Sequence, residues 1–196
     1  MTRDHEPAQN LNELLDAVNQ AAERDQVSVK HVLQEFGERS ITPFILLISL
    51  LLISPISGIP GVPTVSAIII VTLAAQALAG RDHIWMPDVI LRRHLSGERL
   101  RDAVDWMRKP CAFLDRHSHA RLRLLTSGPM RVLTLLVCIL LPSSWPMLEL
   151  LPMVTSIGAA TIALLTFGLF TRDGLYVSAG YGMVGILIGV VFWVWP

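Results

Sequence analysis

Charge is scarce in this chain, and long stretches have none. Charged residues make up 16% of the 196 positions and hydrophobic residues 52%, whereas about 25% charged residues is usual in a soluble domain. No charge occurs between Arg39 and Arg81, and segments 132–148, 150–171 and 174–196 are also uncharged. About 20 apolar residues cross a bilayer core of roughly 30 Å, and a soluble protein of this size has no interior for four such segments. The sequence therefore predicts an integral membrane protein.

Other absences exclude further classes of function. The 16 basic and 16 acidic residues cancel, so the basic excess typical of a nucleic-acid binder is missing. The two cysteines, Cys111 and Cys138, support neither a disulfide framework nor a metal site, and His117 and His119 have no further ligands in suitable spacing. No P-loop, glycine-rich nucleotide motif or Ser-His-Asp arrangement is present. We therefore expect a protein that is not an enzyme, with no cofactor, no metal and no nucleic-acid partner.

The polar regions predict how the chain is oriented. Residues 1–39 carry eight acids against four bases and lack the features of a cleavable signal peptide. Residues 10–38 favour two short amphipathic helices, the second capped by Ser28. Residues 81–131 hold 11 of the 16 basic residues and six acids, and positively charged loops stay in the cytoplasm. We therefore place the N-terminus and residues 81–131 on the cytoplasmic side.

The basic region also has a helical pattern. Leu91, Leu95, Leu100, Val104 and Met107 recur at helical spacing, which predicts surface-lying helices with an arginine-rich polar side. Those arginines either contact anionic headgroups in general or bind a polyanion or anionic lipid specifically. Both interpretations stay open at this point.

Two apolar segments, 45–82 and 132–173, resemble each other. Each has an apolar arm, a proline cluster, a Pro-x-Val sequence, a second apolar arm and a closing Arg-Asp pair. Pro63 matches Pro152, and Arg81-Asp82 matches Arg172-Asp173. Paired interrupted segments in corresponding halves of a chain indicate a binding site in transporter folds.

The first arms of these hairpins are short. Residues 42–53 make about 18 Å of helix and residues 132–141 about 15 Å, and neither length spans roughly 30 Å of hydrocarbon. The tips therefore either lie within the membrane, where irregular backbone must be buried or line a wet cavity, or form external turns of tilted, fully spanning hairpins. The last segment crosses once towards Trp195, and its Gly-x-x-x-Gly at 185–189 permits close packing within the chain or in a homodimer.

These patterns predict an all-α integral membrane protein. Two Pro/Gly-interrupted helical hairpins form an internal repeat, followed by a C-terminal transmembrane helix and accompanied by cytoplasmic amphipathic helices. We expect five parts: an acidic N-terminal arm at 1–40, a first hairpin at 41–80, a basic connector at 81–131, a second hairpin at 132–173 and the last helix at 174–196.

Candidate binding residues gather at the hairpin tips. Glu149 is the one acid within the apolar part of a hairpin, a place where ionisable groups are costly and often functional. It lies either in a buried site suited to proton coupling or at a wet turn. The candidate ligand-binding set is Pro55, Ser57, Gly58, Pro60, Gly61, Pro63, Pro142, Ser143, Ser144, Glu149 and Pro152. The residues that mark the charge boundaries are Arg39, Arg81, Asp82, Arg131, Arg172 and Asp173.

The boundary arginines are open to several interpretations. By default, such side chains extend to the headgroup region. Arg81-Asp82 and Arg172-Asp173 could instead pair across the repeat axis, or the arginines could form an anion-binding ring, which their spacing alone does not support.

Several motifs in order resemble the bacterial ExoD family of inner-membrane proteins associated with exopolysaccharide synthesis. They are Val27-Ser28-Val29, Pro55-Ile56-Ser57-Gly58-Ile59-Pro60-Gly61, Trp85-Met86-Pro87, Arg92-Arg93 with Glu98-Arg99-Leu100, and Arg172-Asp173-Gly174-Leu175. The resemblance covers nearly the whole chain. It implies the bacterial inner membrane and a biological process, but no catalytic residues.

Two hypotheses for function follow. The first is a small transporter-like protein whose hairpin tips bind an ion, a proton-linked solute or a lipid-like precursor. The alternative is an accessory or scaffold protein of the exopolysaccharide machinery, in which the basic and acidic regions dock on synthesis proteins or on each other. The bilayer is the expected surrounding in both.

Overall fold

The computed structural model describes residues 15–16, 19, 26–28, 41–81, 84–85, 87, 94–117, 122–148 and 152–194. It is helical apart from one two-stranded antiparallel sheet, so the predicted helical class is confirmed. Glu149, Arg39 and Asp82 lie outside the described residues. The elements are β1 (Gln26–Ser28), α3 (Ile41–Ile53), η1 (Pro55–Gly58), α4 (Val62–Leu78), β2 (His94–Ser96), α6 (Gly97–His117), η2 (Arg123–Leu125), α7 (Gly128–Ser143), α8 (Trp145–Leu148), α9 (Pro152–Thr171) and α10 (Gly174–Val194).

Proline and glycine set the ends of the first hairpin. The helix α3 stops at Ile53, shortly before Pro55, because a residue that precedes proline is driven out of helical geometry. Gly61, at a φ of 88°, turns the chain into α4, which carries Pro63 in its first turn, where a missing N–H costs little. The helix ends at Leu78, Gly80 follows with a φ of 68°, and the Arg81 N–H donates to the Gln76 carbonyl at 3.0 Å. This is the hydrogen bond that closes a Schellman motif.

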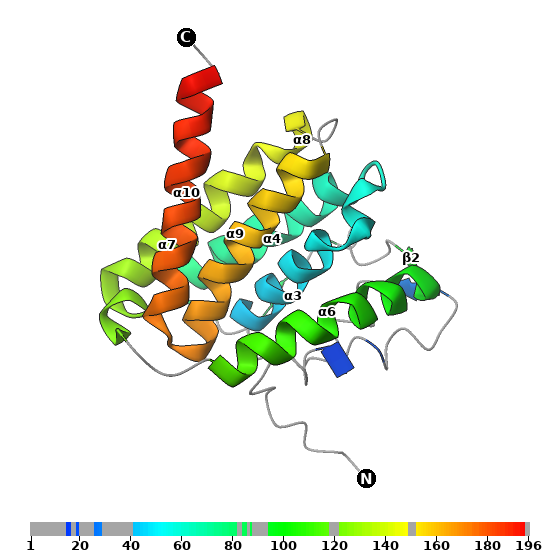
Figure 1. Ribbon diagram of the computed structural model, residues 1–196, viewed down its shortest axis with the longest axis horizontal. Helices are drawn as coiled ribbons and strands as arrows, with labels where there is room; N and C mark the ends of the chain where they lie inside the picture. The colour runs from blue at the N-terminus through cyan, green and yellow to red at the C-terminus, as the bar shows by residue number, and fades with distance from the viewer. Residues whose placement is uncertain are drawn as a thin grey trace.

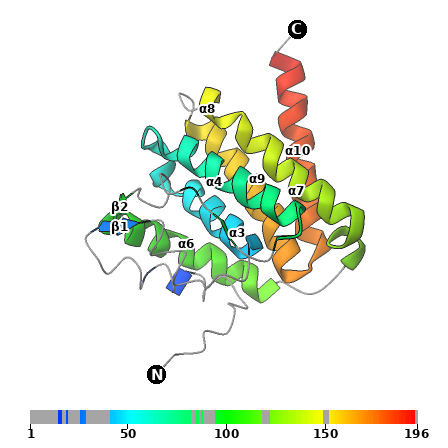
Figure 2. The same ribbon diagram turned by 180° about the vertical axis from the view of Figure 1, so that it is seen from behind.

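The two hairpins interlock around one core. Helix α3 packs mainly on α9, and α4 packs mainly on α7. The two contacts are equivalent in the internal repeat. Each one joins the first helix of one hairpin to the second helix of the other. The core between the hairpins includes Ile45, Ile70, Leu73, Cys138 and Ile162. Figures 1 and 2 place α8 and the turn after α3 at one end of the bundle, and α10 extends past that end.

Helix α6 covers the outer side of α3 and α9 (Figure 1). The face defined by Leu100, Val104, Met107 and Cys111 is buried in a second core with residues of α3 and α9. The predicted amphipathic helix is thus confirmed from Gly97 onward, with its apolar side in contact with protein. Leu95 does not share this face, because it pairs with Val27 in the antiparallel ladder of β1 and β2. The prediction of helix at that position was wrong.

The connector between α4 and α6 is held to α4 by the side chain of Gln76. Its Nε2 donates to the carbonyl of Trp85 at 2.7 Å, and the Trp85 N–H donates to its Oε1 at 2.6 Å. Since Gln76 is buried, both ends of its amide are satisfied by the connector backbone, as a buried amide requires.

Close packing of α10 uses other glycines than the predicted stripe. A Cβ at Gly180 would lie 2.7 Å from Leu165 Cγ, whereas one at Gly182, Gly185 or Gly189 would meet nothing within 4 Å. The α9–α10 contact therefore depends on Gly180 and on Gly168, where a Cβ would lie 2.8 Å from the Val177 backbone nitrogen. Within the described residues, no helix packs closely against Gly185 or Gly189 of the Gly-x-x-x-Gly sequence.

The apolar surface is concentrated on α7 and α10. Leu140 is 70% exposed and Ile186 is 67% exposed. By length and composition, Gly128–Met147 is the one helical stretch among the described residues able to cross a membrane, while Ile41–Ile53, Val62–Leu78, Thr155–Thr171 and Gly174–Val190 are shorter apolar helices. Only 28% of the apolar window in Gly128–Met147 is buried, whereas the core helix of a soluble protein would be mostly covered.

Candidate functional site

The tip of the first hairpin contacts the second hairpin through two serines. The Oγ atoms of Ser57 and Ser156 lie 3.0 Å apart and form a hydrogen bond, although the residues are 99 positions apart. Ser57 is 7% exposed. The 3-10 turn η1 positions it, with the Ser57 N–H donating to the carbonyl of Ser54 at 3.2 Å. The fold thus brings one predicted site residue, Ser57, against the second hairpin.

The other predicted residues of the first tip have different surroundings. Gly58 and Pro60 are exposed, Gly61 is half-buried at the N-cap of α4, and Pro63 is buried in its first turn. Pro55 begins η1. Within this group, Ser57 is the residue whose described side chain forms a hydrogen bond with the second hairpin.

Two of the predicted polar residues of the second tip, Ser143 and Ser144, bond to their own helix instead of to Ser57. The Oγ of Ser143 donates to the Ile139 carbonyl at 2.6 Å, and that of Ser144 donates to the Leu141 carbonyl at 2.8 Å. Both side chains are therefore exposed and bonded back to their own helix. Pro142 is buried inside α7, and Pro152 begins α9.

Trp145 fills the space inside the second tip. It is 1% exposed, and a Cβ at Gly158 would lie 2.9 Å from its Nε1 atom. Gly158 therefore permits the close approach of the indole to α9. The part of the second hairpin that meets Ser57 is the start of α9, where the sequence pattern singled out Pro152 but not Ser156.

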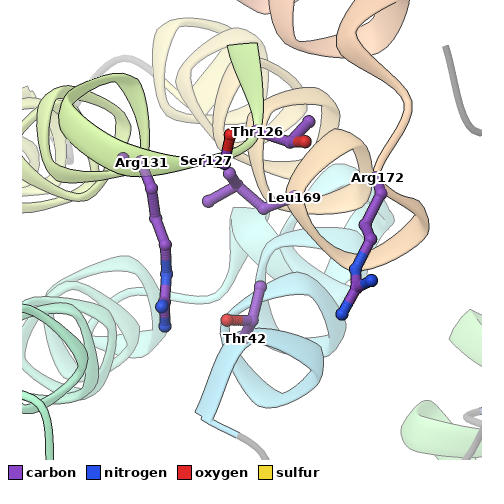
Figure 3. Close-up of a pocket in the computed structure, with 7 residues that line it drawn as sticks. Thr42, Thr126, Ser127, Arg131, Leu169 and Arg172 are labelled. Carbon is purple, nitrogen blue, oxygen red and sulfur yellow. The ribbon is translucent and has the colours of Figure 1, made fainter. Parts of the chain in front are cut away.

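A cavity of about 500 Å³ lies at the other end of the hairpins. It is formed where α3 and α7 begin and where α9 ends, and Figure 3 shows Arg131 and Arg172 on either side of Thr42. The residues that line it are Thr42, Thr126, Ser127, Gly128, Arg131, Leu169 and Arg172. We call it the basal cavity.

The basal cavity is suited to an anion. None of the described residues that line it is acidic, whereas two are arginines and three carry hydroxyl groups. Ser127 and Gly128 are the N-cap and first residue of α7, and a helix N-terminus presents backbone N–H groups and a positive dipole end. Of the predicted boundary residues, the fold therefore brings Arg131 and Arg172 together.

The remaining described boundary residues have structural roles. Asp173 is fully buried, and its Oδ1 accepts the N–H of Leu175 at 3.0 Å, which satisfies a first-turn donor of α10. Arg81 is exposed and donates its backbone N–H to Gln76. Within the described residues, neither Arg81 nor Arg172 takes part in an ion pair.

The basic connector and the acidic N-terminal region contact each other. Arg108 Nη1 donates to Asp16 Oδ1 at 2.8 Å, and Arg108 Nε lies 3.4 Å from Asp105 Oδ1. The hydrogen bond to Asp16 is the main cause that raises the pKa of Arg108 above its ordinary value. Because these side chains are largely exposed, water and salt screen the pair.

These features define a helical protein of two interlocked apolar hairpins, with one candidate membrane-crossing helix in the part of the chain that the structure describes. The family model described as "Exopolysaccharide synthesis, ExoD" matches residues 11–194, so the chain belongs to the ExoD family. It is 30% identical over 182 residues to Protein ExoD of Rhizobium meliloti (strain 1021), a similarity that covers 88% of this chain and 72% of that protein. No solved structure matches. The predicted resemblance is confirmed.

Proposed function

We propose that this chain is an inner-membrane protein of exopolysaccharide synthesis that moves a polar solute or precursor past the contact between its two hairpins. The hydrogen bond between Ser57 and Ser156 carries this proposal. The pair is part-buried and links the two hairpins, and Ser57 Oγ also donates to the Ser54 carbonyl at 3.2 Å. Serine hydroxyls that bond across membrane helices join them at polar contacts, and this contact is the polar link between the two tips on which the proposal is built.

The lengths of the helices support a first hairpin that enters the membrane without crossing it. Helix α3 has 13 residues, about 20 Å, and α10 has 21 residues, about 31 Å. By backbone length alone, α10 reaches the roughly 30 Å of a hydrocarbon core and α3 does not, although the apolar stretch of α10, Gly174–Val190, is one of the shorter ones. The second hairpin reaches further, because α7 and α8 together cover the 20 residues Gly128–Met147.

The distribution of exposed side chains supports the membrane location. Large apolar residues are exposed along α7 and along α10, and apolar surface of this kind indicates a membrane or protein contact. Helix α6 lies over α3 and α9 with its apolar face against them and its polar face exposed, on the cytoplasmic side of the proposed topology. The exposed apolar residues of α7 and α10 are Val132, Leu133, Leu136, Leu140, Leu175, Ile186, Ile188 and Val190.

Cysteine labelling tests the topology. In a variant with Cys111 and Cys138 replaced by alanine, we expect an impermeant maleimide outside the cell to label Met147→Cys at the second tip. It should not label Gly58→Cys or Pro60→Cys, although detergent should expose both. Equal labelling of all three positions in intact cells would contradict a first hairpin that ends within the membrane.

Substitution of the two serines tests the function. A hydrogen bond contributes about 1 kcal/mol, and losing that much stabilisation from the transition state of a transport step slows the step about fivefold. We expect Ser57→Ala and Ser156→Ala to lower exopolysaccharide output about fivefold in cells that lack the natural copy. Ser178→Ala is the matched control, because its exposed hydroxyl donates only to the Leu175 carbonyl. Normal output from both tip variants, at equal protein levels, would contradict the proposal.

Proton movement is a second readout. Purified protein in liposomes that contain a pH-sensitive dye should conduct protons, and Glu149→Gln should reduce that flux if this carboxyl is part of the pathway. A flux that does not depend on Glu149, Ser57 or Ser156 would remove the basis for transport at the tips.

The accessory-protein hypothesis is supported by a different observation. Trp106 is 52% exposed on the polar face of α6, and large aromatic residues are enriched where proteins bind each other. This hypothesis expects charge reversal at Arg101 and Lys109 to abolish output while the serine substitutions at the tips do not. The transport hypothesis expects the opposite pattern.

A further inference from the structure

The basal cavity lies at the end of the hairpins opposite to the contact between Ser57 and Ser156. We propose that it binds a phosphate group, held between the guanidinium groups of Arg131 and Arg172. This site is separate from the transport proposal, and only its assignment to the cytoplasmic side depends on the topology proposed above.

Three parts of the chain supply the donors of this site. Arg131 projects from the first turn of α7, Arg172 follows the end of α9, and Thr42 is the second residue of α3 (Figure 3). The first turn of α7 borders the same cavity through Ser127 and Gly128. The donors thus come from the beginning of the first hairpin and from both ends of the second.

The chemistry of these donors matches phosphate better than a carboxylate. Arginine binds phosphate oxygens through two parallel N–H donors, and a helix N-terminus adds backbone donors for the same ligand. A phosphate group has enough oxygens to accept from two guanidinium groups and from hydroxyls at once. Without a bound anion, the positive charges of Arg131 and Arg172 would line the same cavity with no acidic residue among its described lining residues to balance them.

The backbone of Arg172 supports a functional role for its side chain. Arg172 has a φ of 55°, and the Asp173 N–H donates to the Gly168 carbonyl at 3.0 Å. The corresponding position of the first hairpin is Gly80, which has a φ of 68°. A left-handed conformation is easy for glycine and unfavourable for arginine. Leu122, next to the start of η2, shares this unfavourable backbone at a φ of 50°, so the conformation supports the proposal only together with the position of Arg172 in the cavity.

The phosphate group could come from a soluble compound or from an anionic phospholipid headgroup. Both present the same oxygens, and the cavity opens at the end of the bundle where charged residues flank the apolar segments. The two sources differ in an experiment, because one is available in detergent solution and the other only in a bilayer or mixed micelle.

The experiment measures thermal unfolding and ligand binding of the purified full chain. In neutral detergent, inorganic pyrophosphate is titrated against sodium chloride of equal ionic strength. In nanodiscs, phosphatidylcholine is compared with a mixture that contains phosphatidylglycerol. We expect saturable stabilisation in at least one arm, with the responding arm identifying the source of the phosphate.

Variants assign the effect to the cavity. Loss of one charge-assisted contact should weaken binding about 10-fold or more in Arg131→Gln and in Arg172→Gln, and Arg131→Lys should bind at an intermediate level. Arg101→Gln, an exposed arginine of α6 outside the cavity, is the matched control and should bind like the wild type.

Two further variants separate binding from folding. Arg172→Gly keeps the left-handed backbone and removes the guanidinium, so it should be as stable as the wild type without ligand and should still bind weakly. Thr42→Val removes one hydroxyl at nearly constant volume and should weaken binding less than either arginine substitution. The proposal is overturned if neither arm shows saturable stabilisation, or if Arg131→Gln, Arg172→Gly and Arg101→Gln respond equally.

Discussion

The contact between α9 and α10 is the feature on which the position of Arg172 depends, and Gly168 allows a direct test of it. A Cβ at residue 168 would lie 2.5 Å from Val177 Cγ2, 2.8 Å from the Val177 backbone nitrogen and 2.9 Å from the Asp173 carbonyl oxygen. A rotamer change can move only the first of these atoms. The substitution Gly168→Ala must therefore separate the two helices or distort the turn between them.

The expected magnitude follows from two opposing effects. Overpacking costs up to about 3 kcal/mol, and we use this upper value because two of the three close atoms belong to the backbone. Against this cost, alanine is favoured over glycine inside a helix by about 1 kcal/mol. Gly168→Ala should therefore lower the free energy of unfolding by about 2 kcal/mol. Gly185→Ala, where a Cβ meets nothing within 4 Å, should gain the alanine preference alone. The two variants should differ by about 3 kcal/mol.

The assay is thermal unfolding of the purified full chain in mild detergent, followed by circular dichroism at 222 nm. For a chain of this size, about 3 kcal/mol corresponds to a difference of about 6–12 °C between the two midpoints. Gly168→Ala should also weaken binding at the basal cavity, because the displaced turn carries Arg172. Equal midpoints for Gly168→Ala and Gly185→Ala would refute the close α9–α10 packing.

Three further predictions concern the core and its surface. Trp145→Ala should destabilise the protein by about 3–5 kcal/mol, measured by the same unfolding assay, since the indole is 1% exposed; a loss below about 1 kcal/mol would show that the second tip is not packed in this way. Cys111 and Cys138, both fully buried, should react with a maleimide slowly in the folded protein and rapidly in denaturant, and rapid labelling of both in the folded state would contradict the two cores. Asp16→Asn should change the free energy of unfolding by less than about 1 kcal/mol, with no dependence on salt above 0.5 M, and a larger loss would mean that its contact with Arg108 is less solvated than its exposure indicates.

The local patterns of the sequence predicted the elements well where one interaction dominates. Pro55 ends α3, and Gly61 and Pro63 begin α4, within about two residues of the expected positions. These residue types act locally, because proline restricts the backbone and glycine frees it. The buried spacing of Leu100, Val104 and Met107 likewise predicted α6. The pattern failed at Leu95, where pairing with Val27 across some 68 positions overrides helical spacing.

The candidate site was less predictable, because it depends on contacts between distant segments. The sequence singled out Ser57 at the tip and Arg131 and Arg172 at the boundaries, but not which side chains would meet. Ser143 and Ser144 belong to the same candidate set as Ser57 and yet bond to carbonyls of α7. Ser156 and Thr42 have no sequence signal beyond their positions next to a proline cluster and a charge boundary.

The repeat illustrates the same limit at its closing turns. The sequence matched Arg81-Asp82 with Arg172-Asp173, whereas the hydrogen bonds align Gly80 with Arg172 and Arg81 with Asp173. The register of a helix end is decided by which N–H reaches which carbonyl, and an Arg-Asp pair does not specify that.

By itself, the sequence determined that this chain is helical and apolar, belongs to the ExoD family and changes direction at its proline clusters, since these properties depend on the identity of residues near each other. Only the tertiary structure decided that α3 packs on α9 and α4 on α7, that Ser57 meets Ser156, and that Arg131 and Arg172 share one cavity. The reason is physical: apolar helices of similar composition can bury the same area in many arrangements. The choice among them depends on specific close approaches, such as those at Gly158, Gly168 and Gly180, which appear only when the helices are in contact.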